Sequence, residues 1–436
     1  MRKRLCHVLL IALAAAVPAR AQLRLPTLNL PQPLGSLHTD VLRERGTRLL
    51  ANTEQGALAD LRQLRLGALL RQHGDVLEAD PHGEPMVRGQ ILAWSPSPAS
   101  LQAAAVLGLT ILKTETLEEL GESIVTLAVP ARGDTAATLA RLRARDPQGQ
   151  YDVNHVYTGG SARAAAPAPA PAGSVPANAT PAAGAVRVGL VDGGIAADHA
   201  VFRDASIQRW GCDGATIPSA HGTAVAALMV GQSNHFRGVA PRAALYAADV
   251  YCDAPTGGSA ERIAAAFGWL AKQQVAVINV SLVGPPNQVL ERAVGTLVRR
   301  GHLLVAAVGN DGPAAPPLYP ASYPGVVGVS AIDRDGRVLP EAARGPQVMF
   351  AAPGSQMVSA ALGAPPYRIV RGTSFAAPIV AAMLAATLPL PAPEAARKAL
   401  ATLAAQATGV PPRSTSNETG HGILGIAYRN EPASFR

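Results

Sequence analysis

The sequence has little charge, few aromatic residues and three cysteines, and these shortages limit what the protein can be. Charged residues fill 16% of the 436 positions and apolar residues 48%, so a sizeable buried core is possible and disorder is not expected. The formal net charge is +8, but the sequence contains no basic run interleaved with aromatic residues. We therefore expect no nucleic-acid partner. The length allows two or three domains.

No apolar run is long enough for a comfortable membrane span. The longest apolar run near the N-terminus covers residues 5–17. It follows the basic residues 2–4 and precedes residues 19–21, which have the small-x-small pattern of a cleavage site. This order predicts a signal peptide over residues 1–21 and a secreted or periplasmic protein without a stable membrane anchor. The alternative is an uncleaved anchor.

Removal of a signal peptide would take Cys6 away and leave Cys212 and Cys252. Two cysteines in an exported protein favour one disulfide between them. The alternative is a pair of buried thiols.

The first half of the chain divides into three parts. Residues 22–88 carry leucines at helical spacing over 41–72, and we expect a helical segment of unknown role. Residues 89–158 alternate in the order β-α-β-β-α-β, which predicts a small ferredoxin-like α+β domain. The expected strands are 90–94, 110–116, 123–129 and 151–157, and the expected helices are 98–107 and 135–145. Residues 159–184 are rich in Ala and Pro and predict a semi-stiff linker.

The second half, residues 185–430, alternates apolar strands with helices. The expected strands are 186–191, 243–250, 275–280 and 303–308, and the expected helices are 221–230, 259–272 and 288–300. This predicts an α/β domain with a mostly parallel sheet and helices on both faces. Such sheets place their sites at the carboxyl ends of the strands, and Asp192 and Asn310 both fall there.

Asp192, His221 and Ser374 supply the acid, imidazole and hydroxyl that make serine a nucleophile near neutral pH. A lone serine at a helix start is usually a cap, and a lone histidine is usually structural. The glycine and small residues around both favour catalytic roles here. Asn310 follows a strand end, where its amide can donate to an oxyanion; the alternative is a turn residue.

The sequence motifs around these residues resemble those of the subtilisin-like serine proteases (subtilases). The three motifs that contain the reacting groups are residues 191–194, 221–223 and 372–378. Further motifs similar to those of the family lie at residues 238–241, 245–247, 278–282, 319–324, 350–354 and 422–425. The resemblance implies a subtilisin-like fold and a secreted serine endopeptidase that acts on proteins or peptides. It implies Asp192, His221 and Ser374 as the triad, with Asn310 and the Ser374 backbone N–H as oxyanion donors. Ser281, Leu282 and Val283 would bind substrate, and residues 89–158 would be a propeptide that aids folding and inhibits the enzyme.

The sequence departs from the family pattern at Gly193, Ala224 and Val283, none of which removes a reacting group. We expect no cofactor. Calcium is possible by family resemblance, but no acidic cluster marks a metal site. Two alternatives remain. One is a catalytically inactive, protease-like binding protein. The other is a sedolisin-type acid peptidase with Glu and Asp partners. The His-Gly-Thr motif at residues 221–223 argues against it.

Overall fold

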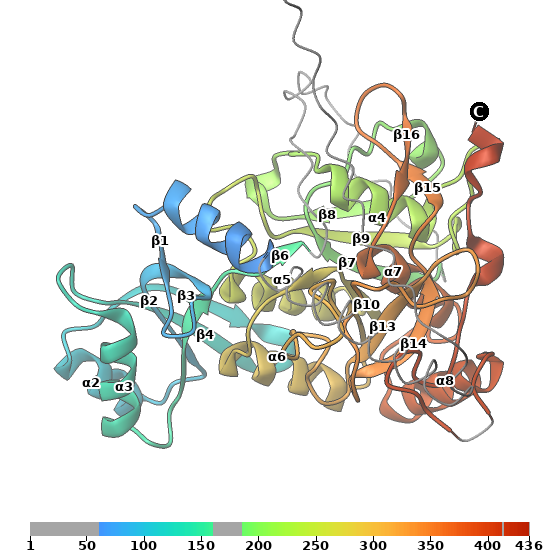
Figure 1. Ribbon diagram of the computed structural model, residues 1–436. Coiled ribbons are helices and arrows are strands. Elements are labelled where there is room, and N and C mark those ends of the chain that lie inside the picture. Colours follow the sequence, from blue (N-terminus) through green and yellow to red (C-terminus); the bar gives the residue numbers. More distant parts are fainter. Residues whose placement is uncertain (1–60, 160–184, 412–413, 436) are drawn as a thin grey trace, which may run out of the picture. The chain divides into compact units, whose positions relative to one another are not determined.

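The computed structural model describes residues 61–159, 185–411 and 414–435. We call residues 61–159 the N-terminal domain and residues 185–435 the C-terminal domain (Figure 1). The expected signal peptide and nearly all of the expected linker lie outside the described residues, as does the helical segment up to residue 60.

The core of the C-terminal domain is a seven-stranded sheet in the order β14-β13-β12-β10-β7-β9-β8. Every neighbouring pair in it is parallel, as the alternation of strands and helices predicted. Its strands are β7 (Arg187–Asp192), β8 (Ile207–Trp210), β9 (Ala244–Asp249), β10 (Val277–Val280), β12 (Leu303–Ala307), β13 (Val327–Ile332) and β14 (Val348–Pro353).

Helices cover both faces of this sheet, and each face has its own apolar cluster. Helices α4 (Ala220–Val230) and α7 (Thr373–Ala385) pack together on one face, and α8 (Pro393–Gln406) packs against α7. Helices α5 (Ala260–Lys272) and α6 (Gln288–Arg299) cover the other face. Both faces of the strands are therefore buried, which explains why the strands are continuous apolar runs. A hairpin of β15 (Met357–Ala360) and β16 (Tyr367–Val370) packs beside α4.

The N-terminal domain is an antiparallel sheet with two helices. The sheet runs β1-β2-β4-β3, and β5 pairs with β2 on its other side. Helices α2 (Pro98–Val106) and α3 (Thr135–Arg145) join these strands, and α3 buries Leu139 and Leu142 on one face. The strands are β1 (Leu77–Ala79), β2 (Pro85–Trp94), β3 (Thr110–Leu117), β4 (Glu122–Ala128) and β5 (Gln150–His155).

Two boundaries of this domain differ from the prediction. It begins before residue 89, because β1 pairs with β2 and a helix over residues 61–72 packs against them. The last expected strand, 151–157, ends at His155. The next residues form β6 (Thr158–Gly159), which leaves this sheet and pairs with β11 (Leu282–Val283) of the C-terminal domain. Gly159 is therefore part of a strand and not of the linker.

The remaining short elements are 3-10 helices over Glu118–Leu120, Ala200–Phe202, Cys212–Gly214, Ile426–Tyr428 and Pro432–Phe435. Within the described ranges, no helix combines the length and the apolar character that a membrane crossing requires.

Candidate active site

Asp192 is the last residue of β7, an inner strand of the parallel sheet, and it is buried. One of its carboxylate oxygens accepts the Gly193 N–H at 2.7 Å. Both oxygens also lie 2.9 Å from Nδ1 of His221. The acid is therefore fixed by the end of a strand, and it orients the imidazole from one side.

His221 lies in the first turn of α4, one residue after the helix begins. Ser219 caps this helix by accepting the Gly222 N–H at 2.9 Å. Glycine is required at 222, because a Cβ there would collide with the Gly193 carbonyl oxygen. This close approach of the α4 start to the end of β7 brings the imidazole to Asp192.

The second imidazole nitrogen, Nε2 of His221, is buried and has no hydrogen-bond partner among the described residues. Since Nδ1 faces a carboxylate, Nδ1 carries the proton and Nε2 is left as an acceptor. The ring packs on Phe375 with 5.5 Å between the ring centroids. Phe375 directly follows Ser374, so the imidazole lies against the start of α7.

Ser374 is the second residue of α7 and is buried. Its hydroxyl donates to the Ser281 carbonyl oxygen at 3.5 Å, which is a long contact. The N-cap residue of α7 is Gly372, which has no side chain to accept the amides of the first turn. The hydroxyl and the helix start thus lie at the carboxyl ends of the central strands.

Asn310 lies just beyond β12 and next to the start of α7. Its Oδ1 accepts the Thr373 N–H at 2.9 Å, while the Thr373 hydroxyl accepts the Gly309 N–H at 3.2 Å. The amide nitrogen Nδ2 is the donor group of this side chain. The structure thus brings Asn310 beside Ser374, and Asp192 beside His221.

The three residues expected to bind substrate have different surroundings. The Ser281 hydroxyl donates to the Ser374 carbonyl oxygen at 3.1 Å and accepts from Nδ2 of Asn279 at 2.9 Å. Its side chain therefore supports α7. Leu282 and Val283 form β11, whose pairing edge is occupied by β6 of the N-terminal domain.

Two supporting residues were missed at the sequence level. Asn279 positions Ser281, and Thr373 joins the loop of Asn310 to α7. Both lie inside motifs that carry the family resemblance, at residues 278–282 and 372–378. Their place in those motifs was the only signal of a role at the site, because the roles themselves depend on contacts between distant strands and helices.

Tyr157 was also missed, and it lies at the boundary of the two domains. It is fully buried, and its hydroxyl donates to the Pro285 carbonyl oxygen at 2.7 Å. Its ring lies against Gly284, where a Cβ would come within 2.5 Å of a ring carbon. Burial raises the pKa of Tyr157 well above its ordinary value, and the neighbouring Tyr323 adds to this effect. The neutral tyrosine is thus buried against Gly284 and Pro285 of the C-terminal domain.

The structure joins Cys212 and Cys252 by a disulfide. In the described parts of the chain, the only cluster of three residues with metal-ligand character is this cystine pair with Asp249. Sulfurs in a disulfide are not thiolate ligands, so this cluster does not fit a metal site. Burial raises the pKa of Asp249, two backbone N–H groups oppose this rise, and the charge of Asp192 adds to it. These three residues therefore do not form a calcium site.

The departures from the family pattern have structural counterparts. A Cβ at Gly193 would lie 2.5 Å from the Ser219 hydroxyl oxygen, so this chain needs glycine where its α4 cap packs closely. Ala224 is buried within α4, and Val283 is buried opposite Thr158. None of the three occupies the position of a reacting group.

The model of the Subtilase family of peptidases matches residues 183–422, more than half of the chain. The chain belongs to the subtilase family. Subtilisin DY from Bacillus licheniformis is 33% identical over 215 residues, which are 47% of this chain and 76% of that protein. The minor extracellular protease Epr of Bacillus subtilis is 35% identical over 168 residues, 38% of this chain. The chain covers only 26% of the length of Epr.

Among solved structures, fervidolysin from Fervidobacterium pennivorans, described as a keratinolytic enzyme related to subtilisin, has a TM-score of 0.63. It covers 81% of this chain and 62% of its own, with 17% identity. The epidermin leader peptide processing protease from Staphylococcus aureus has a TM-score of 0.57 and covers 78% of this chain and 98% of its own, with 15% identity. These likenesses show the fold. Each spans more of this chain than the C-terminal domain alone.

Proposed function

We propose that this subtilase is a secreted serine endopeptidase with Asp192, His221 and Ser374 as its catalytic triad. The observation that carries the proposal is the state of His221. Its Nδ1 faces both oxygens of a buried aspartate, while its buried Nε2 has no partner among the described residues and the ring packs against the residue after Ser374. A general base requires this combination of one orienting bond and one vacant acceptor.

The reaction follows from these positions. Nε2 of His221 takes the proton of the Ser374 hydroxyl as the serine oxygen attacks a peptide carbonyl. Asp192 stabilises the imidazolium through Nδ1. Nδ2 of Asn310 and the Ser374 N–H donate to the oxyanion of the tetrahedral intermediate. His221 then protonates the leaving amine, and water hydrolyses the acyl-enzyme in a second round of the same chemistry.

We infer further that the N-terminal domain is an inhibitory propeptide, and that protein or peptide substrates take its place. Two contacts support this. Strand β6 occupies the edge of β11, where an extended substrate would add as a strand. Tyr157 is buried against Gly284, and its hydroxyl binds the Pro285 carbonyl oxygen. Substrate can pair with β11 only after β6 has left.

Export of the enzyme is supported by the sequence of residues 1–21 and by the Cys212–Cys252 disulfide, which suits an oxidising compartment. Epr, one of the relatives, is named as an extracellular protease.

The test is hydrolysis of casein and of a peptide library by the full chain after it has matured. Wild-type protein should cut within peptides near neutral or alkaline pH, and Ser374→Ala should abolish cutting. Ser95→Ala is the matched control, because this serine is exposed in the N-terminal domain and bonds only within it. A wild-type protein as inactive as Ser374→Ala would support the binding-protein alternative. An optimum at about pH 3–4 would support the acid-peptidase alternative.

A further inference from the structure

The helix over residues 61–72 carries an arginine that contacts both domains. Two nitrogens of the Arg62 guanidinium bind the two carboxylate oxygens of Glu84 at 2.5 and 2.8 Å. Its third nitrogen, Nε, forms an ion pair with Asp311 of the C-terminal domain at 2.9 Å. The three side chains are 13–14% exposed, so this is a largely buried charge cluster and not a solvated surface pair.

Asp311 directly follows Asn310, so the Arg62 ion pair is made to the loop that carries the proposed oxyanion donor. Burial raises the pKa of Asp311, and Arg62 and Arg65 offset part of that rise. Burial also acts to lower the pKa of Arg62, but Glu84 and Asp311 together raise it. Each charge therefore depends on the others. Removing one partner would leave a buried charge without compensation, which is strongly unfavourable.

The helix that carries Arg62 is anchored in the N-terminal domain. Its residues Leu69 and Leu70 pack against an apolar cluster of Leu77, Val87 and Val156. Val156 precedes Tyr157 and β6, the segment that occupies the β11 edge. The helix is thus packed on the residues that lead into the proposed inhibitory strand.

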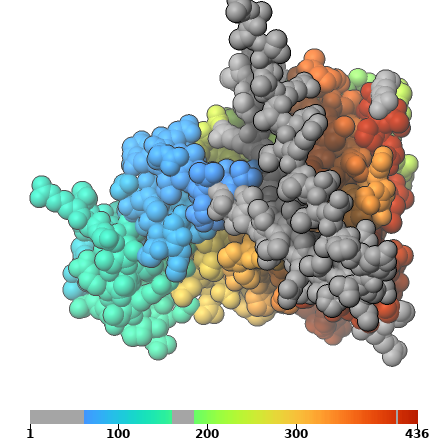
Figure 2. Space-filling view, viewed as in Figure 1, coloured from blue at the N-terminus to red at the C-terminus, as the bar shows by residue number. Residues whose placement is uncertain are grey.

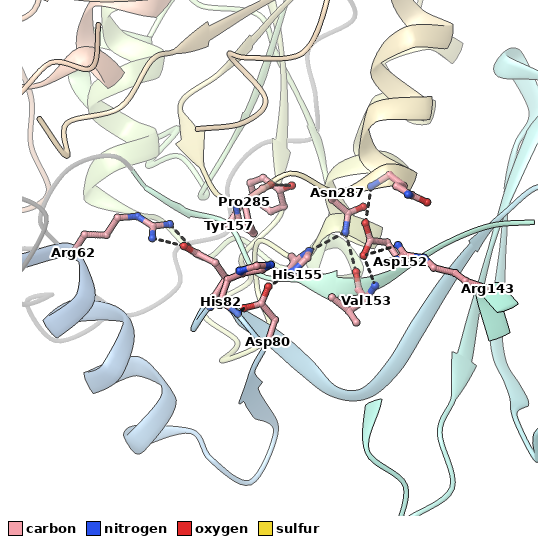
Figure 3. Close-up of polar contacts among 12 residues, drawn as sticks. Arg62, Asp80, His82, Arg143, Asp152, Val153, His155, Tyr157, Pro285 and Asn287 are labelled. Carbon is pink, nitrogen blue, oxygen red and sulfur yellow. Dashed lines mark hydrogen bonds and ion pairs between the residues drawn. The ribbon is translucent and has the colours of Figure 1, made fainter. Parts of the chain in front are cut away.

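Glu84 also belongs to a second polar connection between the domains, of which Figure 3 labels Asp80, His155 and Asn287. The Glu84 N–H donates to Asp80, and the other oxygen of Asp80 lies 3.3 Å from Nε2 of His155. Nδ1 of His155 lies 3.1 Å from the amide nitrogen of Asn287, at the start of α6. In Figure 3, Arg62 and Asp80 lie on one side of His155 and Asn287 on the other. The turn over residues 80–84 therefore links the Arg62–Asp311 contact to the contact at α6.

We propose that the helix over residues 61–72 is a latch that holds the N-terminal domain on the loop of Asn310, with Arg62 binding Asp311. The proposal rests on the inhibitory role of that domain, and it assigns a task to the upstream segment whose role the sequence left open. Release of β6 from β11 then requires the Arg62–Asp311 pair to open as well, so the latch slows the release.

The test measures hydrogen exchange of the full chain carrying Ser374→Ala, which keeps the chain intact. Arg62→Ala should speed exchange of the amides in β6 and β11 at least tenfold. Arg88→Ala is the matched control. It removes an arginine of the same domain whose side chain binds Glu78 and the carbonyl oxygens of Gly74 and Leu77, all within the N-terminal domain. It should leave the β6 and β11 amides at the parent rate.

Asp311→Asn removes the pair from the other side and leaves the N-terminal domain unaltered, so it tests the latch even if Arg62→Ala unfolds the helix. It should give a comparable acceleration, and the double variant should add little to either single one. Parent exchange rates at β6 and β11 in Asp311→Asn would overturn the latch. The readout involves no catalysis, so an inactive enzyme with the expected exchange pattern would refute the proposed function and leave the latch standing.

Discussion

The proposed active site and the domain interface both centre on a histidine, and the two imidazoles are held in different ways. His221 is oriented through one nitrogen by Asp192, and its other nitrogen has no partner among the described residues. His155 is engaged through both nitrogens, with Asp80 on one side and Asn287 on the other. A half-engaged imidazole is available for proton transfer, whereas a fully engaged one is suited to joining two surfaces.

Two further side chains of the N-terminal domain accept hydrogen bonds across the interface. Asp152 accepts the Gln288 N–H at the start of α6 at 2.7 Å, and Asn154 accepts the Glu261 N–H at the start of α5 at 3.2 Å. The N-terminal domain thus supplies acceptors for orphan amides of two helices of the C-terminal domain. In Figure 2, the blue and teal atoms of the N-terminal domain lie against yellow atoms of the C-terminal domain. The start of α7, which carries Ser374, has no side-chain cap of its own.

The largest expected difference between the two regions is in catalysis. His221→Ala, matured by added wild-type enzyme that is then removed, should lower kcat by about 10⁶-fold, the size known for removal of the serine or histidine of subtilisin. His155→Ala should leave kcat of the matured enzyme unchanged, because that residue would depart with the N-terminal domain. Steady-state hydrolysis of one peptide by both variants makes the comparison. Equal losses would show that the two histidines have been assigned to the wrong roles.

A second pair of variants compares Asn310 with Asn287. Asn310→Ala should lower kcat by about 10²–10³-fold with little change in KM, because an oxyanion donor acts mainly in the transition state. Asn287→Ala should leave kcat near that of the parent and cost about 1 kcal/mol of stability, because Asn287 caps α6 by accepting the Leu290 N–H. Kinetics and thermal unfolding of the matured proteins test both halves. A large rise in KM for Asn310→Ala would indicate a role in ground-state binding instead.

The smallest expected effect concerns pH and Asp80. Burial acts to raise the pKa of Asp80, but its bonds to His155 and to two backbone N–H groups lower it overall. The stabilisation by the ionised carboxylate is therefore present above the unfolded pKa, near 3.8, and is lost as pH falls through the lower folded pKa. In the intact Ser374→Ala chain, Asp80→Asn should flatten the acid limb of stability below about pH 4. A steeper acid limb in the variant would contradict this sign.

The parts of the molecule that depend on short local sequence motifs could be predicted from the sequence. Asp192 ends a strand, and His221 and Ser374 open helices, because each lies at the end of an apolar segment with glycine or small residues beside it. The parallel sheet was predictable for the same reason, since its strands are continuous apolar runs. The sequence also placed most strands and both helices of the N-terminal domain near their observed bounds.

The interface was not predictable, because its contacts join residues far apart in the chain and follow no periodicity. Asn287 and Val153 are 134 positions apart, and neither lies in a sequence motif with a recognisable function. Arg62 and Asp311 are ordinary charged residues until the fold brings them together. Strand β1 was missed because three residues are too few for an alternating pattern to be visible.

The most direct test of the central claim is to map the residue modified by a fluorophosphonate in the matured protein by peptide mass spectrometry. We expect one modified peptide, carrying the adduct on Ser374, and its loss in His221→Ala, because without the base the serine is not a strong nucleophile. Modification of a different serine, or undiminished labelling of Ser374 in His221→Ala, would contradict the account.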